Sequence, residues 1–428
     1  MGGVNLNRNE PSSSNHAKYG ANVKQLYLCT SNLLYIMSLY AQRGVSAQKE
    51  EVHAAIQHLD QGLYPNAFCK LYADFLGGQS DYINIMHADG AGTKSILAYI
   101  YWKETGDASV WKGIAQDAIA MNLDDLLCVG IYDQILFSST IDRNKSVITG
   151  EILSQVINGT QEFFNTLKTY GVNIEFLGGE TADVGDVVRT IAVNGTMTAR
   201  WPKSKLITND LIAAGQVIVG FSSHGQAKYE TAYNSGLGSN GLTSARHDVL
   251  SKVYASKYPE TFESSLSDAV VYIGKNQIND EIEIPGFGPI TVGKLLLSPT
   301  RTYAPLVKAI LADHFDAVKG MIHCSGGGQT KCMKYLPGNM RIVKDNFMPV
   351  PPIFNIIQSN SGANAREMYQ VFNMGHRLEI FTTPKEAETL ISIATTLGID
   401  SQVIGRVEAS DTKELVLKGD FGTETFNY

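Results

Sequence analysis

Residues 82–94, YINIMHADGAGTK, join an apolar strand predicted over residues 82–86 to a glycine-containing turn that opens a helix. The two glycines of the turn let the backbone approach a phosphate, Thr93 offers a hydroxyl, and Lys94 offers a mobile positive charge. Asp89 would repel a phosphate unless a cation lay between them, so the turn also indicates Mg²⁺. It is not a P-loop, and by itself it is equally compatible with a purely structural turn.

A second acidic feature follows in a long apolar helix predicted over residues 110–129. Asp117 lies about two turns before Asp124 and Asp125, so it shares one side of this helix with one of these two acids. Acids on an otherwise apolar helix are costly to bury unless they meet a cation. The alternative is that the later acids only cap or edge the helix.

Three more small-residue motifs occur downstream. Glu180 directly follows two glycines at the end of a strand predicted over residues 174–177, where nothing crowds the approach of a metal ion, although such a pair is also common in plain turns. The loops at residues 236–242 and 323–330 each precede a predicted helix, and backbone N–H groups at a helix start can bind an anion. Each motif is weak evidence alone, but their number and order together indicate a phosphate-handling site.

Composition limits the classes of protein. The 428 residues are 44% hydrophobic and 18% charged, as in a globular chain, and the net charge of −7 without any basic run argues against a nucleic-acid partner. Five cysteines without a CxxC pair are typical of reduced thiols in a cytoplasmic protein. The apolar stretch at residues 26–40 is too short and too interrupted for a membrane helix, so no membrane partner is expected.

The alternation of strands and helices predicts an α/β (α+β) fold in two domains. Residues 1–39 are predicted to be a disordered or mis-started extension, because they are mainly polar at first and the later pattern starts only near Tyr40. Residues 40–208 form the predicted N-terminal domain, for ATP binding and dimerisation. The pattern resets at a polar turn followed by a buried strand, so residues 209–428 form the predicted C-terminal α/β domain.

Seven motifs in order carry a resemblance to a known family: DGAGTK, the Asp117–Asp125 helix, GGETAD, GSNGL, LLSPTRTY (residues 296–303), HCSGGG and EMYQVFNMG (residues 367–375). From about residue 85 to residue 407 the chain resembles the aminoimidazole ribonucleotide synthetase, or phosphoribosylformylglycinamidine cyclo-ligase, family. The acidic motifs are shared with a wider superfamily that includes small-molecule kinases. The SPTRTY and EMYQVFNMG stretches favour the cyclo-ligase.

This resemblance implies a homodimer in which the N-terminal domains complete a shared β-barrel. It implies formylglycinamidine ribonucleotide as the substrate, with ATP and Mg²⁺. The reaction would phosphorylate the formyl amide oxygen, after which the amidine nitrogen closes the imidazole ring and phosphate leaves. Such chemistry depends on shielding phosphate charge and on holding the reacting atoms close together.

The resemblance also implies roles for individual residues. The implied metal ligands are Asp89, Asp117, Asp125 and Glu180. The implied ATP and phosphate contacts are Gly90, Gly92, Thr93, Lys94, Ser239, Gly241, Gly326, Gly327 and Gly328. The implied catalytic residues are Asp89, Lys94 and Asn240.

Two departures from the family pattern stand out. Gly238 occupies the position where the family usually has a histidine, with His224, His247 and His323 as candidate replacements. The family's glycine-rich segment before the strand at residue 82 is replaced by LYPNAFCKLYADFLGGQSDY, where Lys70 could supply a charge. Two alternative functions therefore stay open: a superfamily kinase that does not cyclise its substrate, and a degenerate ATP-binding protein.

Overall fold

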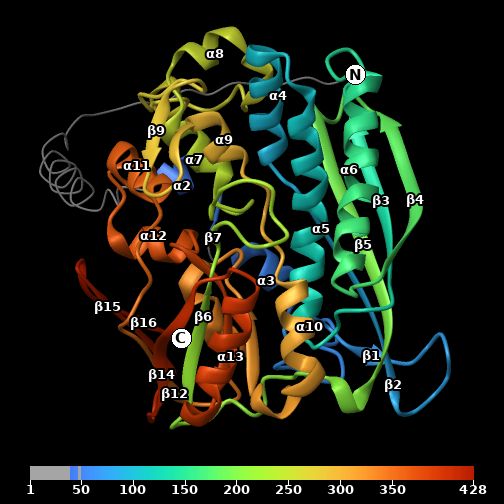
Figure 1. The fold of residues 1–428 in the computed structure, drawn as a ribbon. Coiled ribbons are helices and arrows are strands. Elements are labelled where there is room, and N and C mark those ends of the chain that lie inside the picture. The colour runs from blue at the N-terminus through green and yellow to red at the C-terminus, as the bar shows by residue number, and fades with distance from the viewer. Residues whose placement is uncertain (1–38, 47–49) are drawn as a thin grey trace, which may run out of the picture.

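The computed structural model describes residues 39–46 and 50–428, which form two sheets with their helices (Figure 1). Nearly all of the extension predicted over residues 1–39 lies outside the described residues. The described chain opens with two short helices, α2 (Leu39–Gln42) and α3 (Glu50–Ile56).

The first sheet has five strands in the order β1-β2-β5-β3-β4, with β3 and β4 parallel and the other neighbours antiparallel. Buried and more exposed residues alternate along β3 and β5, because successive side chains of a strand point to opposite faces. One face therefore belongs to the core, and the other is open. The strands are β1 (Tyr72–Ala73), β2 (Tyr82–Gly90), β3 (Ile135–Arg143), β4 (Ile174–Asp183) and β5 (Ile191–Pro202).

Three helices pack on the core side of this sheet: α4 (Lys94–Thr105), α5 (Trp111–Leu127) and α6 (Gly150–Thr169). Helix α5 lies between the two domains, since it contacts β2 and β5 on one side and α10 and β11 of the second domain on the other. This double burial explains why its sequence is apolar on nearly every side. Acidic residues on α5 must therefore find partners inside the protein.

The second sheet has seven strands in the order β11-β13-β6-β14-β12-β15-β16. Its strands are β6 (Val217–Ser222), β11 (Gly320–His323), β12 (Met340–Lys344), β13 (His376–Thr382), β14 (Ser401–Ala409), β15 (Glu414–Gly419) and β16 (Gly422–Asn427). Two small hairpin-like sheets pair β7 (His224–Gly225) with β8 (Asn234–Ser235) and β9 (Glu281–Ile284) with β10 (Gly288–Thr291). The helices are α7 (Leu242–Val249), α8 (Val253–Lys257), α9 (Val292–Leu297), α10 (Ala304–Asp313), α11 (Pro352–Ser361), α12 (Ala365–Val371) and α13 (Pro384–Thr396).

Two predicted strands end later than expected. The strand predicted over residues 82–86 continues as β2 through Gly90, and the strand predicted over residues 174–177 continues as β4 through Asp183. Glycine has low strand propensity, so both runs resembled turns, but pairing with β5 and β3 holds them extended. Asp89 and Glu180 are consequently strand residues with fixed directions.

Candidate active site

Three of the motifs meet in space, although they are far apart in the sequence. Thr93 of the DGAGTK turn and Thr243, in the first turn of α7, share a hydrogen bond of 2.9 Å between their hydroxyls. On the other side, a Cβ placed on Gly326 would lie 3.7 Å from the side-chain nitrogen of Asn240. The GSNGL loop therefore lies between the DGAGTK turn and the HCSGGG loop.

The glycines of these loops are required by their backbone. Gly241 precedes α7 with φ of 79°, and a Cβ there would lie 2.3 Å from the ring of Phe372. Gly327 and Gly328 also have positive φ, where other residues are strained. The predicted helix after the HCSGGG loop is a 3₁₀ helix instead, Gly328–Tyr335. This segment packs mainly against α12 and also contacts β11 and β15.

An acid–imidazole cluster lies at the end of α5. One carboxylate oxygen of Asp125 is 2.6 Å from Nδ1 of His323, and the other is 3.3 Å from Nε2 of His87. Burial by itself would raise the pKa of Asp125, but the two imidazoles outweigh burial and lower this pKa well below its usual range. Asp125 is therefore an ionised, oriented carboxylate.

Asp89 lies beside this cluster, on the same strand as His87. Its carboxylate accepts a 2.7 Å hydrogen bond from the N–H of Gly90. Burial, with the nearby charge of Asp125, raises the pKa of Asp89 above its usual value. Burial opposes the protonation of His87, but Asp125 outweighs burial and raises the pKa of this imidazole. Two carboxylates and two imidazoles thus lie together where the DGAGTK and HCSGGG motifs approach.

The segment that replaces the family's glycine-rich stretch forms a wall of this cluster. The Phe68 ring stacks on Tyr335, with centroids 4.6 Å apart, and the Cys69 thiol donates a 3.2 Å hydrogen bond to the backbone carbonyl of Asp125. Lys70, the candidate charge, instead faces Asp60 at the surface, 3.6 Å away. No local pattern in the sequence points to Cys69, because its partners come from distant segments.

Lys94 and Asp117 have a different environment from the rest of the predicted site. Both side chains are fully buried and form an ion pair of 2.8 Å. The ammonium also donates to the carbonyl of Ser298, and the same Asp117 oxygen accepts from the N–H and hydroxyl of Thr300 at 2.7 and 2.5 Å. Burial lowers the pKa of Lys94. We refer to these four residues as the buried clamp, which ties α4 and α5 to the SPTRTY segment.

Glu180 does not lie with the other predicted metal ligands of the same chain. The register pairs Glu180 with Thr140, Thr140 with Asn194, and Asn194 with Gly90. Three strand spacings, about 14 Å, thus separate Glu180 from the end of β2. By strand alternation Glu180 points to the open face, whereas Asp89 points to the helix-covered face. Within one chain the four acids therefore do not form one set: Asp89 and Asp125 approach each other, and Asp117 and Glu180 do not join them.

Arg377, which belongs to none of the sequence motifs, lies where the family histidine would be. A Cβ on Gly238 would be 3.1 Å from Nη1 of Arg377, and Gly238 has φ of 72°, which strains any other residue. Arg377 pairs with Asp124 at 3.0 Å, while its buried Nε has no partner among the described residues. Arg377 and Gly238 are far apart in the sequence, so only the three-dimensional structure shows that they are neighbours.

The candidate histidines differ in their environments. His247 is fully buried in α7 and accepts a 3.2 Å hydrogen bond at Nδ1 from the N–H of Tyr272. Burial, helped by Arg246, lowers its pKa to about 2, so it stays neutral. Burial beside Arg301 lowers the pKa of His224 to about 4. Of the three candidates, His323 is the one in the acid–imidazole cluster.

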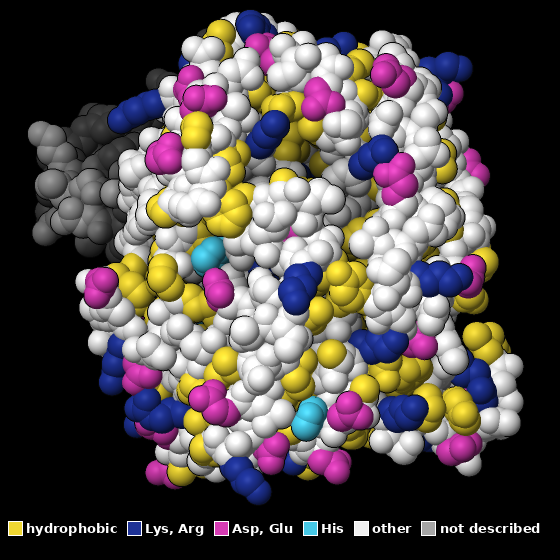
Figure 2. Space-filling model, viewed as in Figure 1, with side chains coloured by type: hydrophobic (Ala, Val, Ile, Leu, Met, Phe, Trp, Pro, Cys, Tyr) yellow, Lys and Arg dark blue, Asp and Glu magenta, His cyan; other side chains and the backbone are white. Residues whose placement is uncertain are grey.

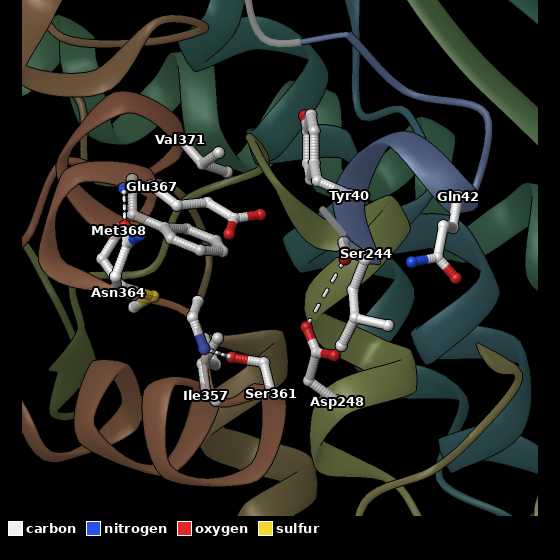
Figure 3. Close-up of a pocket in the computed structure, with 14 residues that line it drawn as sticks. Tyr40, Gln42, Ser244, Asp248, Ile357, Ser361, Asn364, Glu367, Met368 and Val371 are labelled. Carbon is white, nitrogen blue, oxygen red and sulfur yellow. Dashed lines mark hydrogen bonds between the residues drawn. The ribbon is translucent and has the colours of Figure 1, made fainter. Parts of the chain in front are cut away.

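A cavity of about 540 Å³ (Figure 3) is lined in part by Phe372, the ring that a Cβ on Gly241 would meet. Helices α2 and α7 form one wall, with Tyr40 and Asp248, and α11 and α12 form the other, with Ile357 and Glu367. None of the predicted phosphate-loop residues lines it. The cavity therefore adjoins the candidate site through the Phe372 ring without being part of it.

Two family models match the chain, one on each sheet. The N-terminal domain of AIR synthase related proteins matches residues 74–201, and the C-terminal domain matches residues 213–418. The domain boundary at residue 209 remains a prediction.

Similar curated proteins span most of the chain. The phosphoribosylformylglycinamidine cyclo-ligase of Methanocaldococcus jannaschii is 32% identical over 76% of this chain and 79% of its own length. That of Brevibacillus brevis is 28% identical over 77% and 82%. A solved structure of PurL from T. maritima, complexed with ADP, has a TM-score of 0.50 at 12% identity, and the match covers 95% of this chain but only 53% of that one.

The folds and loops described above define a two-domain α/β protein of the AIR synthase related type. The chain belongs to the phosphoribosylformylglycinamidine cyclo-ligase family within that group, which confirms the family and the enzyme class that the motifs predicted. The face drawn in Figure 2 mixes basic and acidic side chains without a large basic patch. Across residues 39–46 and 50–428, every helix is too short or too polar to cross a membrane.

Proposed function

We propose that this chain is an ATP-dependent cyclo-ligase that converts formylglycinamidine ribonucleotide to aminoimidazole ribonucleotide, releasing ADP and phosphate, in purine biosynthesis. The observation that carries the proposal is the meeting of the DGAGTK, GSNGL and HCSGGG motifs beside the acid–imidazole cluster. The names of the curated relatives support the same reaction.

In this reaction the amide oxygen receives the γ-phosphoryl group of ATP and becomes a good leaving group. The amidine nitrogen then bonds to the activated carbon, and the C–O bond breaks with loss of phosphate. Bound Mg²⁺ would neutralise phosphate charge during the transfer. Asp89 and Asp125 fit this ion, because they are adjacent carboxylates whose oxygens are the ligands that Mg²⁺ prefers.

The loops have the remaining proposed roles. Gly90, Gly92 and Thr93 would contact the ATP phosphates, and the loop with Ser239 and Asn240 would hold the substrate. Backbone N–H groups at the start of α7 can bind an anion without an imidazole, and Arg377 places a positive charge behind Gly238. We propose that Arg377 provides the charge that the family histidine would supply.

Lys94 and Asp117 have a proposed structural role instead. Every observed contact of Lys94 and of one Asp117 oxygen lies inside the buried clamp, so we propose that they hold the DGAGTK turn in position. The other Asp117 oxygen is buried and has no hydrogen-bond partner among the described residues. Phosphate contact by Lys94 and metal binding by Asp117 remain predictions from the resemblance.

The open face of the first sheet supports the proposed homodimer. Met86 and Leu136 flank Thr198 in one row across β2, β5 and β3, and they are 74% and 41% exposed, while Leu177 on β4 is 63% exposed. Such an apolar surface is typical of a protein interface. A two-fold partner on this face would also meet Glu180.

Light scattering of the wild type and of Met86→Glu tests this dimer. We expect a dimer that the charged side chain weakens, whereas an exposed Ser154→Glu control on α6 should leave it intact. A stable monomer at micromolar concentration would rule out the shared barrel.

The proposed reaction is tested by measuring ADP release with and without formylglycinamidine ribonucleotide. We expect release only with the substrate present. Release with an unrelated small hydroxyl acceptor would favour a superfamily kinase, and no release at all would favour a degenerate ATP-binding protein.

A further inference from the structure

Three potential metal ligands of different chemistry lie together beside Asp89. The Cys69 sulfur, a ring nitrogen of His87 and a carboxylate oxygen of Asp125 all lie within 4.8 Å of one another. Sulfur, imidazole and carboxylate are the donors that Zn²⁺ takes in proteins, whereas Mg²⁺ takes oxygens. The set therefore differs in kind from a site for Mg²⁺ and ATP.

The orientation of the His87 ring is determined by Asn122. The Asn122 amide nitrogen lies 3.0 Å from the carbonyl of Asp89, and within 3.1 Å of two further backbone carbonyls, those of Ala118 and Gly195. Its Oδ1 must therefore accept from Nδ1 of His87, 3.1 Å away. Nε2 is left facing Asp125, with its lone pair available in the neutral ring. Metal-binding histidines in proteins are commonly held in this way through the other nitrogen.

The carboxylate is held in a similar way. His323 binds Oδ1 of Asp125 at 2.6 Å, which leaves Oδ2 toward Nε2 of His87 at 3.3 Å. Two ligands about 2.0 Å from a tetrahedral ion are roughly 3.3 Å apart. The observed oxygen–nitrogen spacing fits one shared ion as well as it fits a simple ion pair.

The third ligand is the thiol of Cys69. Its side chain is buried, but the other two ligands are partly exposed. Cys69 is 6% exposed, and the side chains of His87 and Asp125 are 22% and 13% exposed. An ion can therefore reach the two partly exposed ligands first. On binding, the S–H bond of Cys69 breaks, its proton passes to solvent, and a sulfur–metal bond forms.

We propose that Cys69, His87 and Asp125 form a three-ligand site for a divalent ion of the Zn²⁺ type, with the fourth position open to solvent. The site uses sulfur and nitrogen and requires no nucleotide. It shares Asp125 with the proposed Mg²⁺ site, but its test contains neither nucleotide nor substrate, so either proposal can fail without the other.

Cobalt is the probe for this site, because Co²⁺ substitutes for Zn²⁺ and is coloured. Full-length, metal-free protein without nucleotide is titrated with Co²⁺. We expect one ion per chain, a thiolate-to-cobalt charge-transfer band in the near ultraviolet, and intense visible bands of four-coordinate cobalt. Zn²⁺ should displace the ion, and excess Mg²⁺ should not.

Variants assign the ligands. Cys69→Ser should abolish the charge-transfer band, and His87→Ala should weaken Co²⁺ binding by roughly tenfold or more. The matched control is Cys332→Ser, since Cys332 is also a buried free thiol but lies outside the cluster. Weak six-coordinate bands alone, displacement by Mg²⁺, or an unchanged spectrum in Cys69→Ser would overturn the proposal. If Cys69→Ser does not fold, unchanged Co²⁺ affinity in His87→Ala would overturn it.

Discussion

The acid–imidazole cluster and the buried clamp draw on the same two pieces of chain, the DGAGTK turn and α5, yet they differ in access. His87 and Asp125 keep 22% and 13% of their side chains exposed, whereas Lys94 and Asp117 keep none. The difference comes from the SPTRTY segment, which covers Asp117 through Thr300. Acids of one helix can therefore serve chemistry at one end and domain packing in the middle.

The clamp is tested most severely by Asp117→Asn. This change leaves the Lys94 ammonium buried without a counter-charge, so we expect a loss of about 3–5 kcal/mol in the free energy of unfolding. Urea denaturation measures it. The double variant Lys94→Met with Asp117→Asn should recover most of the loss, because it buries no charge and keeps an acceptor for Thr300. A loss below about 1 kcal/mol, as for a surface pair, would contradict the clamp.

The cluster is tested by Asp89→Asn. We expect turnover to fall at least about a hundredfold, since loss of a key electrostatic group costs roughly 3 kcal/mol. Folding should change little, because the substitution removes repulsion from Asp125. Steady-state kinetics with a melting curve on the same sample separates the two effects. Near wild-type turnover in Asp89→Asn would show that Asp89 is not part of the active site.

The contrast between these regions also shows which features of the fold and of the site can be predicted from the sequence. The motifs predicted the family, the two mixed α/β domains and the long helix α5, because period and turn residues are local signals. The spacing of the acids along α5 could not predict that Asp117 pairs with Lys94 and Asp125 with His87, because both partners come from other elements. Glu180 was placed at a strand end, but pairing with β3 extends the strand and turns its side chain to the open face.

The comparison extends to the GSNGL loop and the helix that follows it. Asn240 lies in the loop beside Gly326, whereas His247 is sealed in α7 against Tyr272. We therefore expect Asn240→Ala to reduce kcat/KM by roughly tenfold or more, as expected for lost positioning. His247→Ala should mainly lower stability through the cavity it leaves. If kinetics show the reverse order, the loop-centred account of the site is wrong.

The smallest expected effect concerns pH. Burial holds the folded pKa of His247 at about 2, so the unfolded chain binds a proton below about 6.5 that the folded protein does not. Stability should therefore fall as pH decreases below that value, by at most about 1.4 kcal/mol per pH unit from this group. His247→Gln should flatten this part of the profile in urea denaturation between pH 6.5 and 5, a window set by the unfolded value. A variant profile parallel to the wild type would contradict the neutral, buried imidazole.

The most direct test of the central claim is the ratio of ring-closed product to ADP in a single reaction with formylglycinamidine ribonucleotide and ATP. The account predicts equal amounts of aminoimidazole ribonucleotide and ADP in the wild type. Both should be lost together in Asp125→Asn, because activation and closure depend on the same phosphorylation. ADP formed without ring closure, or ring closure retained in Asp125→Asn, would contradict it.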